Sequence, residues 1–246
     1  MALPDSTAIK TKNFQILSGS TLKIMAIIIM FIDHFGAAFL YHGYLLPNAP
    51  INPGTYPYKV YIFYQVLRFI GRSAFPIFCF LLIQGYMHTS NKKKYAIRLF
   101  LFAIISELPF DLAVHDSIWD WQSQNVFCTL FIGFCVIWLI DIAQNNIILQ
   151  TLIAILGMGL AYILKTDYSY WGILLISALY FFRYQPGLQT LTGCVCLFWE
   201  APACLGFIPI NMYNGKRGIP LKYFFYLFYP VHLLLLTALR YLCFRM

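Results

Sequence analysis

The chain has 246 residues, of which 61% are hydrophobic and only 11% are charged. Because a soluble globular domain carries about 25% charged residues, this composition excludes an ordinary soluble protein and predicts one embedded in lipid. The net charge of +8 would suit a nucleic-acid-binding protein, but no basic face recurs along a polar helix. A positive cytoplasmic side and anionic lipid explain the excess better, so we expect membrane lipid and no nucleic acid as a partner.

Eight apolar segments are candidates for membrane-spanning helices, each of which needs about 20 apolar residues. They are 22–41, 62–88, 95–114, 125–143, 147–164, 169–183, 188–207 and 222–244. We therefore predict an all-α fold, a polytopic transmembrane helical bundle with about eight spans. The loop at 42–60 holds four prolines and is expected to be irregular. Residues 1–20 are polar and are expected to form a short cytoplasmic N-terminal tail without a cleavable signal, followed by one transmembrane domain at 21–246.

The charges of the short loops predict the orientation of the helices, because Lys and Arg gather on the cytoplasmic side. Lys23 opens the first span and the segment 92–98 holds three lysines and an arginine, whereas the loop at 115–124 has two aspartates and neither Lys nor Arg. An even number of spans would then put both termini in the cytoplasm, in a multi-pass protein of the cell membrane. Lys216 and Arg217 do not fit, since this orientation places their loop on the opposite side.

The seven cysteines give no sign of a metal site or a disulfide framework. They are odd in number, lie in apolar segments and lack the CxxC or His/Cys spacing of metal ligands. We expect them to pack in the protein interior and expect no metal.

Asp33 and His34 lie inside the first apolar segment, where an ionisable pair costs several kcal/mol unless it has partners and marks a functional site by default. At a rise of 1.5 Å per residue, His34 lies roughly 18 Å along a hydrocarbon core that is about 30 Å thick. Counted in the same way, other charged residues fall in this layer: Arg68, Arg72, Glu107, Asp111 and Glu200. Independent accidents would scatter these charges over all depths, so their shared depth predicts one site.

The spacing of these charges predicts how they pair. Arg68 and Arg72 are four residues apart and share one helix face, and the two carboxylates of the third span share a face in the same way. We expect the arginine face to pair with this carboxylate face, beside Asp33 and His34. The alternative is a structural salt-bridge network that pins three helices together, but such a network stabilises weakly and needs no histidine.

His34 is the candidate general base, because a neutral imidazole takes up protons near neutral pH. Asp33 projects about 100° away from it on the helix, so we expect Asp33 to pair with an arginine. Glu107 or Asp111 is then expected to orient the His34 ring. His232, at membrane depth on the last span, is open to two interpretations, a packing residue or a residue of the site.

Six sequence blocks, in order along the chain, resemble the TraX family. They are LKI…IDHFG at 22–36, LRFIGRSAFPIF at 67–78, SELPFDL at 106–112, NVFCTL at 125–130, YNGKRG at 213–218 and FYPVH at 228–232. The named member of that family acetylates the N-terminus of a conjugative pilin, so the resemblance implies membrane-bound acetyl transfer with acetyl-CoA as co-substrate. The spacing from Lys23 to His34 is also similar to that of broader membrane acyltransferases. Gln84 departs from the family pattern, in which an acidic residue is often found there.

The resemblance and the depth of the charges together give an expected site. His34 would act as base or acyl carrier, with Asp33 beside it, and Arg68 or Arg72 would stabilise negative charge on the thioester oxygen, with Glu107 and Asp111 balancing the arginines. The residues expected to bind the acceptor are Asn125, Lys216, Arg217 and His232. The residues expected to bind the phosphates of acetyl-CoA are Lys92, Lys93, Lys94 and Arg98, although an ordinary positive-inside loop has the same composition.

Two competing functions stay open at this point. Intramembrane Asp, His and Arg residues are also typical of a proton-coupled membrane transporter, and a non-catalytic scaffold would pair its buried charges fully. The acyl acceptor is equally open, since a peptide amine, a glycan hydroxyl and a lipid head group would all be compatible with these residues.

Overall fold

The computed structural model describes residues 15–220 and 222–244, and helices account for most of them. The elements are α1 (Gly19–His34), η1 (Phe35–Leu45), α2 (Tyr56–Gly71), α3 (Ala74–His88), α4 (Lys92–Phe110), η2 (Asp111–His115), α5 (Val126–Ile142), α6 (Ile147–Ile163), α7 (Ser169–Phe181), α8 (Pro186–Cys196), η3 (Phe198–Gly206), α9 (Phe207–Asn211) and α10 (Lys222–Phe244). Residues 1–14 of the expected N-terminal tail lie outside the described part. The predicted all-α class is confirmed for the described residues.

Three helical stretches are long and apolar enough to cross a membrane: α1 with η1, α2 with α3, and most of α10. They cover Gly19–Leu45, Tyr56–His88 and Tyr223–Phe244, while α5, α6 and α7 are shorter apolar helices. This pattern is that of a membrane protein, although it does not reproduce a count of eight full spans. The irregular loop expected at 42–60 is also shorter than predicted, because η1 continues to Leu45 and α2 begins at Tyr56.

The second predicted span, 62–88, is interrupted where α2 meets α3. Arg72 and Ser73 form a turn between the two helices. Pro76 explains the interruption, because a proline ring displaces the carbonyl four residues earlier, which is that of Arg72, and offers it no N–H. The break places Arg72 at a helix end rather than on a regular helix face.

The expected span at 188–207 is wrong, because this segment is three short helices. α8 ends at Cys196, and η3 contains a non-helical residue, Glu200, with φ −132° and ψ 55°. Pro202 lies inside η3 and the chain then enters α9. Gly193 in α8 packs against the Phe207 ring of α9, so the segment folds back on itself instead of crossing.

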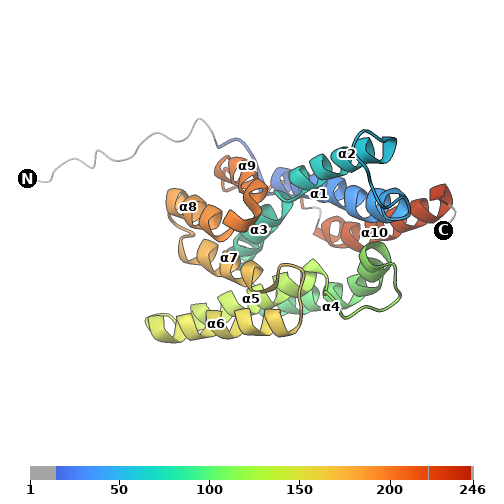
Figure 1. Cartoon of the computed structure of the whole chain (residues 1–246). Helices are drawn as coiled ribbons and strands as arrows, with labels where there is room; N and C mark the ends of the chain where they lie inside the picture. The colour runs from blue at the N-terminus through green and yellow to red at the C-terminus, as the bar shows by residue number, and fades with distance from the viewer. Residues whose placement is uncertain (1–14, 221, 245–246) are drawn as a thin grey trace, which may run out of the picture.

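The first and last helices, α1 and α10, run parallel. The contacting pairs, in order along α1 with η1 and along α10 with the residues before it, are Ser20 with Ile219, His34 with His232, Ala38 with Arg240, and Gly43 with Phe244. The start of α1 and the end of α10 therefore lie at opposite ends of the pair, and in Figure 1 the C-terminal end of α10 lies far from α8 and α9. The expected cytoplasmic location of both termini stays a prediction, although the re-entrant segment α8–α9 changes the count of spans on which it was based.

The loop before α10 lies against the start of α1. Gly19 N–H donates to the Lys216 carbonyl (2.8 Å) and Ser20 N–H donates to the Arg217 carbonyl (3.0 Å). Lys216 and Arg217 therefore share an end of the molecule with Lys23, and their expected position at the opposite mouth is wrong. Their apparent breach of the positive-inside pattern came from the miscounted span.

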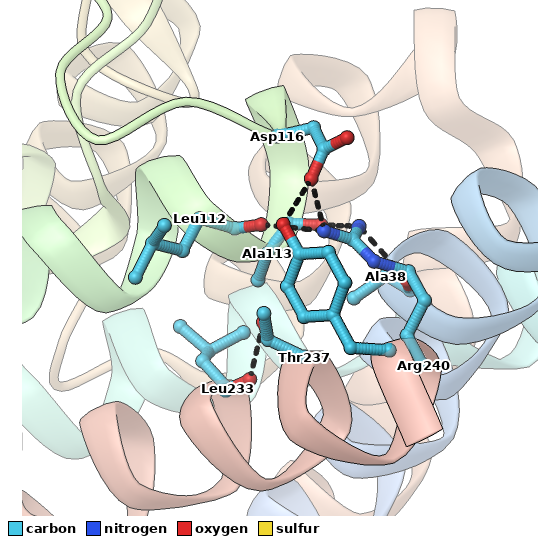
Figure 2. Close-up of polar contacts among 8 residues, drawn as sticks. Ala38, Leu112, Ala113, Asp116, Leu233, Thr237 and Arg240 are labelled. Atoms are coloured by element: carbon cyan, nitrogen blue, oxygen red, sulfur yellow. Dashed lines mark hydrogen bonds and ion pairs between the residues drawn. The ribbon is translucent and has the colours of Figure 1, made fainter. Parts of the chain in front are cut away.

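At the other end, Arg240 connects η1, η2 and α10 (Figure 2). The fully buried guanidinium donates to the carbonyls of Ala38, Leu112 and Ala113, and it forms an ion pair with Asp116. The three carbonyls belong to η1 and η2, the two π-helical segments. Arg240 thus pairs polar backbone groups that a lipid environment would otherwise leave unsatisfied.

Candidate functional site

A cavity of about 120 Å³ lies where α1, the α2–α3 break, α10 and two loops meet. Its lining includes Asp33, His34, Arg68, Arg72, Asp167 and Tyr229, and it also includes Ser123 from the loop before α5. The structure therefore brings four of the predicted site residues together from two separate helices. A space of this size holds reacting groups rather than a whole coenzyme.

Asp33 and Arg68 form an ion pair across α1 and α2, as predicted for Asp33. Gly71 lies directly against this carboxylate, because a Cβ built there would overlap Asp33 Oδ1. The close approach of α1 and α2 at this point therefore requires glycine. One oxygen of the carboxylate, Oδ1, is buried without a hydrogen bond among the described residues, so the pair is only partly satisfied.

Arg72 pairs with Glu200, with its Nε 2.8 Å from Oε1. The expected pairing of the arginines with Glu107 and Asp111 is therefore wrong. The turn between α2 and α3 directs Arg72 toward η3, whose non-helical residue is Glu200 itself. Because η3 is kinked at Glu200, this carboxylate lies beside Arg72. In a regular helix at 188–207 it would lie elsewhere.

His34 is oriented by His232, and not by Glu107 or Asp111 as expected. His232 Nδ1 lies 2.7 Å from the Phe228 carbonyl, which only accepts, so this nitrogen carries the proton. In the neutral ring the His232 Nε2 atom is then an acceptor, and His34 Nδ1, 2.7 Å away, must donate to it. Nε2 of His34 is left with a free lone pair, and His34 lines the cavity. The two rings stack with their centroids 5.0 Å apart.

Glu107, Asp111 and Asn125 lie outside the cavity lining and hold neighbouring segments together. Asn125 caps α5 by accepting from Phe127 N–H (3.0 Å), and its amide donates to Glu107 and to the Ala103 carbonyl. Asp111 accepts from the Asp120 backbone N–H at 3.1 Å. These contacts give all three residues a structural role, because they satisfy buried backbone groups.

The basic segment at the start of α4 divides into paired and exposed residues. Lys92 donates to Asp141 at 2.8 Å and to the Tyr86 hydroxyl at 2.6 Å, so its charge is already compensated. Lys93 and Lys94 belong to the same turn, and Arg98 lies over the Tyr95 ring, 5.4 Å from its centroid. None of these four basic residues lines the cavity.

Asp167 is a cavity residue that sequence reasoning missed. It lies in the short connection between α6 and α7, and its backbone N–H donates to the Gln124 carbonyl at 2.8 Å, which joins this loop to the one before α5. Its neighbour Tyr168 stacks on Phe75 with ring centroids 3.4 Å apart. An acidic residue in a short loop carries no sequence signal, because such residues are common in ordinary turns.

Metal ligation finds no support in the described part of the chain, where no group of three or more His, Cys, Asp or Glu residues could hold an ion. The expected chemistry of the cavity depends instead on the imidazole pair and the two arginines.

Comparison with known proteins gives the family. A family described as "TraX protein" matches residues 18–240. The chain belongs to the TraX family. Among curated proteins, a probable fimbrial assembly protein FimC, serogroup H1, of Dichelobacter nodosus is 28% identical over 254 aligned positions, which cover 91% of this chain and 96% of the relative. No solved structure matches significantly. The stretch that matches the TraX family contains every residue that lines the cavity.

Proposed function

We propose that this TraX-family chain is an integral membrane acetyltransferase that moves an acetyl group from acetyl-CoA to an amine or hydroxyl acceptor on the other side of the membrane. The observation that carries the proposal is the free Nε2 of His34 in a cavity, with Nδ1 held by His232. A histidine that only packs or pairs needs neither a fixed tautomer nor access to a cavity. The same arrangement, in which a second group fixes the tautomer of the base, is how catalytic histidines are prepared for proton transfer.

The proposed step is a general-base acyl transfer. His34 Nε2 takes the proton from the acceptor nitrogen or oxygen as that atom bonds to the acetyl carbonyl carbon. The carbon–sulfur bond then breaks, the thiolate leaves, and the proton on His34 passes to it. His232 Nε2 accepts the hydrogen bond from His34 Nδ1–H throughout the step. This bond stabilises the imidazolium and keeps the His34 ring in place.

Arg68 and Arg72 are proposed to stabilise the negative charge on the carbonyl oxygen. Each guanidinium has five N–H donors, and the ion pairs with Asp33 and Glu200 use only part of them. The remaining donors of both arginines can point into the cavity that these residues line. The two carboxylates then hold the arginines in position rather than cancel their function.

The donor is proposed to enter at the end of the molecule that holds the start of α1. Lys23, Lys216 and Arg217 share that end, and the described residues offer them no acidic ion-pair partner. Lys92 is the weaker candidate for the donor phosphates because it is bound to Asp141. By the positive-inside rule this basic end faces the cytoplasm, where acetyl-CoA is made.

A pilus or fimbrial subunit is the proposed acceptor. The FimC relative is named for fimbrial assembly, and the resemblance to the TraX family implies acetylation of a pilin. The cavity lining includes residues of the loops that precede α5 and α7, which lie at the far end from Lys23. An acceptor approaching from that side would meet His34 from the face opposite the donor.

Transfer of radiolabel from acetyl-CoA in membranes that contain this chain tests the proposal. We expect His34→Ala to reduce labelling by about 10²–10⁴-fold, the usual contribution of a general base, while insertion into the membrane is unchanged. His88→Ala is the matched control, since His88 is exposed and bonds only to the Gln84 carbonyl among the described residues.

The outcome that contradicts the proposal is labelling that persists in His34→Ala membranes. Absence of label in wild-type membranes, with purified fimbrial subunit present, would favour the transporter instead. That second candidate predicts proton movement coupled to a solute, which a pH-sensitive dye in proteoliposomes would detect.

A further inference from the structure

A second histidine, His115, contacts a serine that lines the cavity. His115 Nε2 lies 2.9 Å from Ser123 Oγ, and Ser123 belongs to the same cavity lining as His34. On the other side of the ring, His115 Nδ1 lies 3.9 Å from Asp120 Oδ2. The order serine, histidine, aspartate is the one in which a hydroxyl group is activated as a nucleophile, and it recurs on unrelated folds.

The carboxylate of Asp120 indicates which nitrogen of His115 is protonated. A carboxylate only accepts, so Nδ1 carries the proton on the side of Asp120, and Nε2 accepts the hydrogen bond from the Ser123 hydroxyl. The separation of 3.9 Å between Nδ1 and Oδ2 is longer than a hydrogen bond, and catalytic contacts of this kind shorten when a substrate binds. His115 is therefore oriented as a base toward Ser123.

The loop that carries Ser123 is held by bonds that do not involve His115. Asp111 Oδ2 accepts from the Asp120 N–H at 3.1 Å, and Asp120 Oδ1 accepts from the Gln122 N–H at 2.6 Å. These two bonds fix the Asp120 carboxylate while its other oxygen, Oδ2, lies toward His115. The bond between Ser123 and His115 is thus not needed to hold the loop, which favours a chemical role.

The position of Ser123 suits a residue that carries an acyl group between two substrates. The cavity of about 120 Å³ has room for an acetyl group but not for a whole coenzyme. The proposed entry of the donor is at the end near Lys23, whereas Ser123 directly precedes α5 at the opposite end. A group bound to Ser123 would therefore remain on the side of the acceptor after the donor has left.

We propose that Ser123 is a nucleophile that carries the acetyl group as an ester, with His115 as its base and Asp120 as the residue that positions His115. This inference rests on the proposed acetyl transfer and divides it into two stages. The acceptor then reacts at the Ser123 ester instead of at the thioester, with His34 as its base in either case.

The atoms and protons of both stages balance. In the first stage His115 Nε2 takes the hydroxyl proton of Ser123 as Oγ bonds to the acetyl carbonyl carbon. The carbon–sulfur bond then breaks, and the leaving thiolate takes the proton from His115. In the second stage the acceptor nitrogen or oxygen bonds to the ester carbon and gives its proton to His34. The bond from this carbon to Oγ breaks, and the proton passes from His34 to Ser123 Oγ, which lines the same cavity.

Diisopropyl fluorophosphate tests the nucleophile without acetyl-CoA. This reagent reacts with a serine that a neighbouring base activates: the Oγ–P bond forms, the P–F bond breaks and fluoride leaves. We expect purified wild-type protein in detergent to form an adduct that peptide mass spectrometry places at Ser123. His115→Gln keeps a side chain that can bond to Ser123 but supplies no base, so the labelling should slow by about 10²–10⁴-fold.

Ser117→Ala is the matched control for this labelling. Ser117 lies in the same loop, and its hydroxyl contacts the backbone of Trp119, so the rate of labelling should stay as in the wild type. A bond between His115 and Ser123 that only holds the loop would predict labelling of His115→Gln at the wild-type rate.

Incubation with radiolabelled acetyl-CoA in the absence of an acceptor tests the carrier. We expect the acetyl group to appear on Ser123 of the wild type, to be released by hydroxylamine as an ester is, and to be absent from Ser123→Ala. Addition of purified fimbrial subunit should discharge it.

Two outcomes would overturn the assignment: no adduct at Ser123 in a protein that transfers label from acetyl-CoA, or transfer by Ser123→Ala at the wild-type rate. Either of them would leave direct transfer at His34 in place. An adduct at Ser123 in a protein that transfers no label would uphold the activated serine and count against acetyl-CoA as the donor.

Discussion

Arg240 and the arginine pair of the cavity show two uses of the same side chain in one bundle. Arg240 is fully buried, and its guanidinium is surrounded by three carbonyls and Asp116. Arg68 and Arg72 each have a single carboxylate partner and border an open space. The number of partners separates the arginine that holds helices together from the arginines that are free to act on a ligand.

The largest expected effect is on stability, at Arg240. Arg240→Ala removes the ion pair to Asp116, which the Tyr241 hydroxyl still contacts, and the side-chain donors to three carbonyls, which should lower the free energy of unfolding by about 3–5 kcal/mol. Lys59→Ala, at an exposed lysine, should change the free energy of unfolding by less than about 0.5 kcal/mol.

Arg68→Ala should affect transfer more than stability. We expect a smaller loss of stability than in Arg240→Ala and a loss of transfer of about 10²–10³-fold per folded molecule. Denaturant titration in detergent measures the free energy of unfolding, and the labelling assay measures the transfer. Equal stability losses in Arg68→Ala and Arg240→Ala would contradict the distinction between the two kinds of arginine.

The next effect concerns His232 as the residue that positions His34. His232→Leu removes the acceptor for His34 Nδ1, so we expect kcat to fall by roughly 10²-fold with little change in KM. His232→Gln keeps an acceptor oxygen and should recover part of kcat. A merely structural role would lower kcat equally in both variants, since neither glutamine nor leucine reproduces the shape of the imidazole ring.

The smallest effect concerns glycine. Gly71→Ala puts a Cβ into the space of the Asp33 carboxylate and should displace the ion pair with Arg68, with a cost of about 1–3 kcal/mol and a loss of about tenfold in transfer. Gly159→Ala, in α6, meets nothing within 4 Å and should stabilise the helix by about 0.5–1 kcal/mol. Thermal unfolding of the two variants in detergent tests the difference in sign. A stable, fully active Gly71→Ala protein would show that the close approach of α1 and α2 has no functional consequence.

The sequence predicted the depth of the site better than its pairing. Counting residues from the ends of the apolar segments placed His34, Arg68 and Arg72 in one layer, and the structure brings them to one cavity. Depth depends only on the rise of a helix, which is constant. The neighbour of a residue depends on rotation and on the packing of distant segments, so the partners Glu200 and His232 were not predicted.

The mistaken span at 188–207 has a related cause. Its mean composition is that of a membrane helix, and only Pro202 and the charge at Glu200 indicate a break. Hydrophobicity alone does not distinguish a segment that crosses from one that turns back inside protein. The expected orientation of the last helix was based on that count, so a single misread segment also gave the wrong position for Lys216, which lies beside the start of α1.

The pairing of His34 with His232 joins positions 198 residues apart in the chain. During synthesis the first helix enters the membrane long before the last one exists. Until α10 is inserted, Nδ1 of His34 has no acceptor and the ring has no fixed tautomer. In an incomplete chain still attached to the ribosome, the proposed base therefore has no fixed tautomer, and this arrangement of His34 forms only with the last helix to be made.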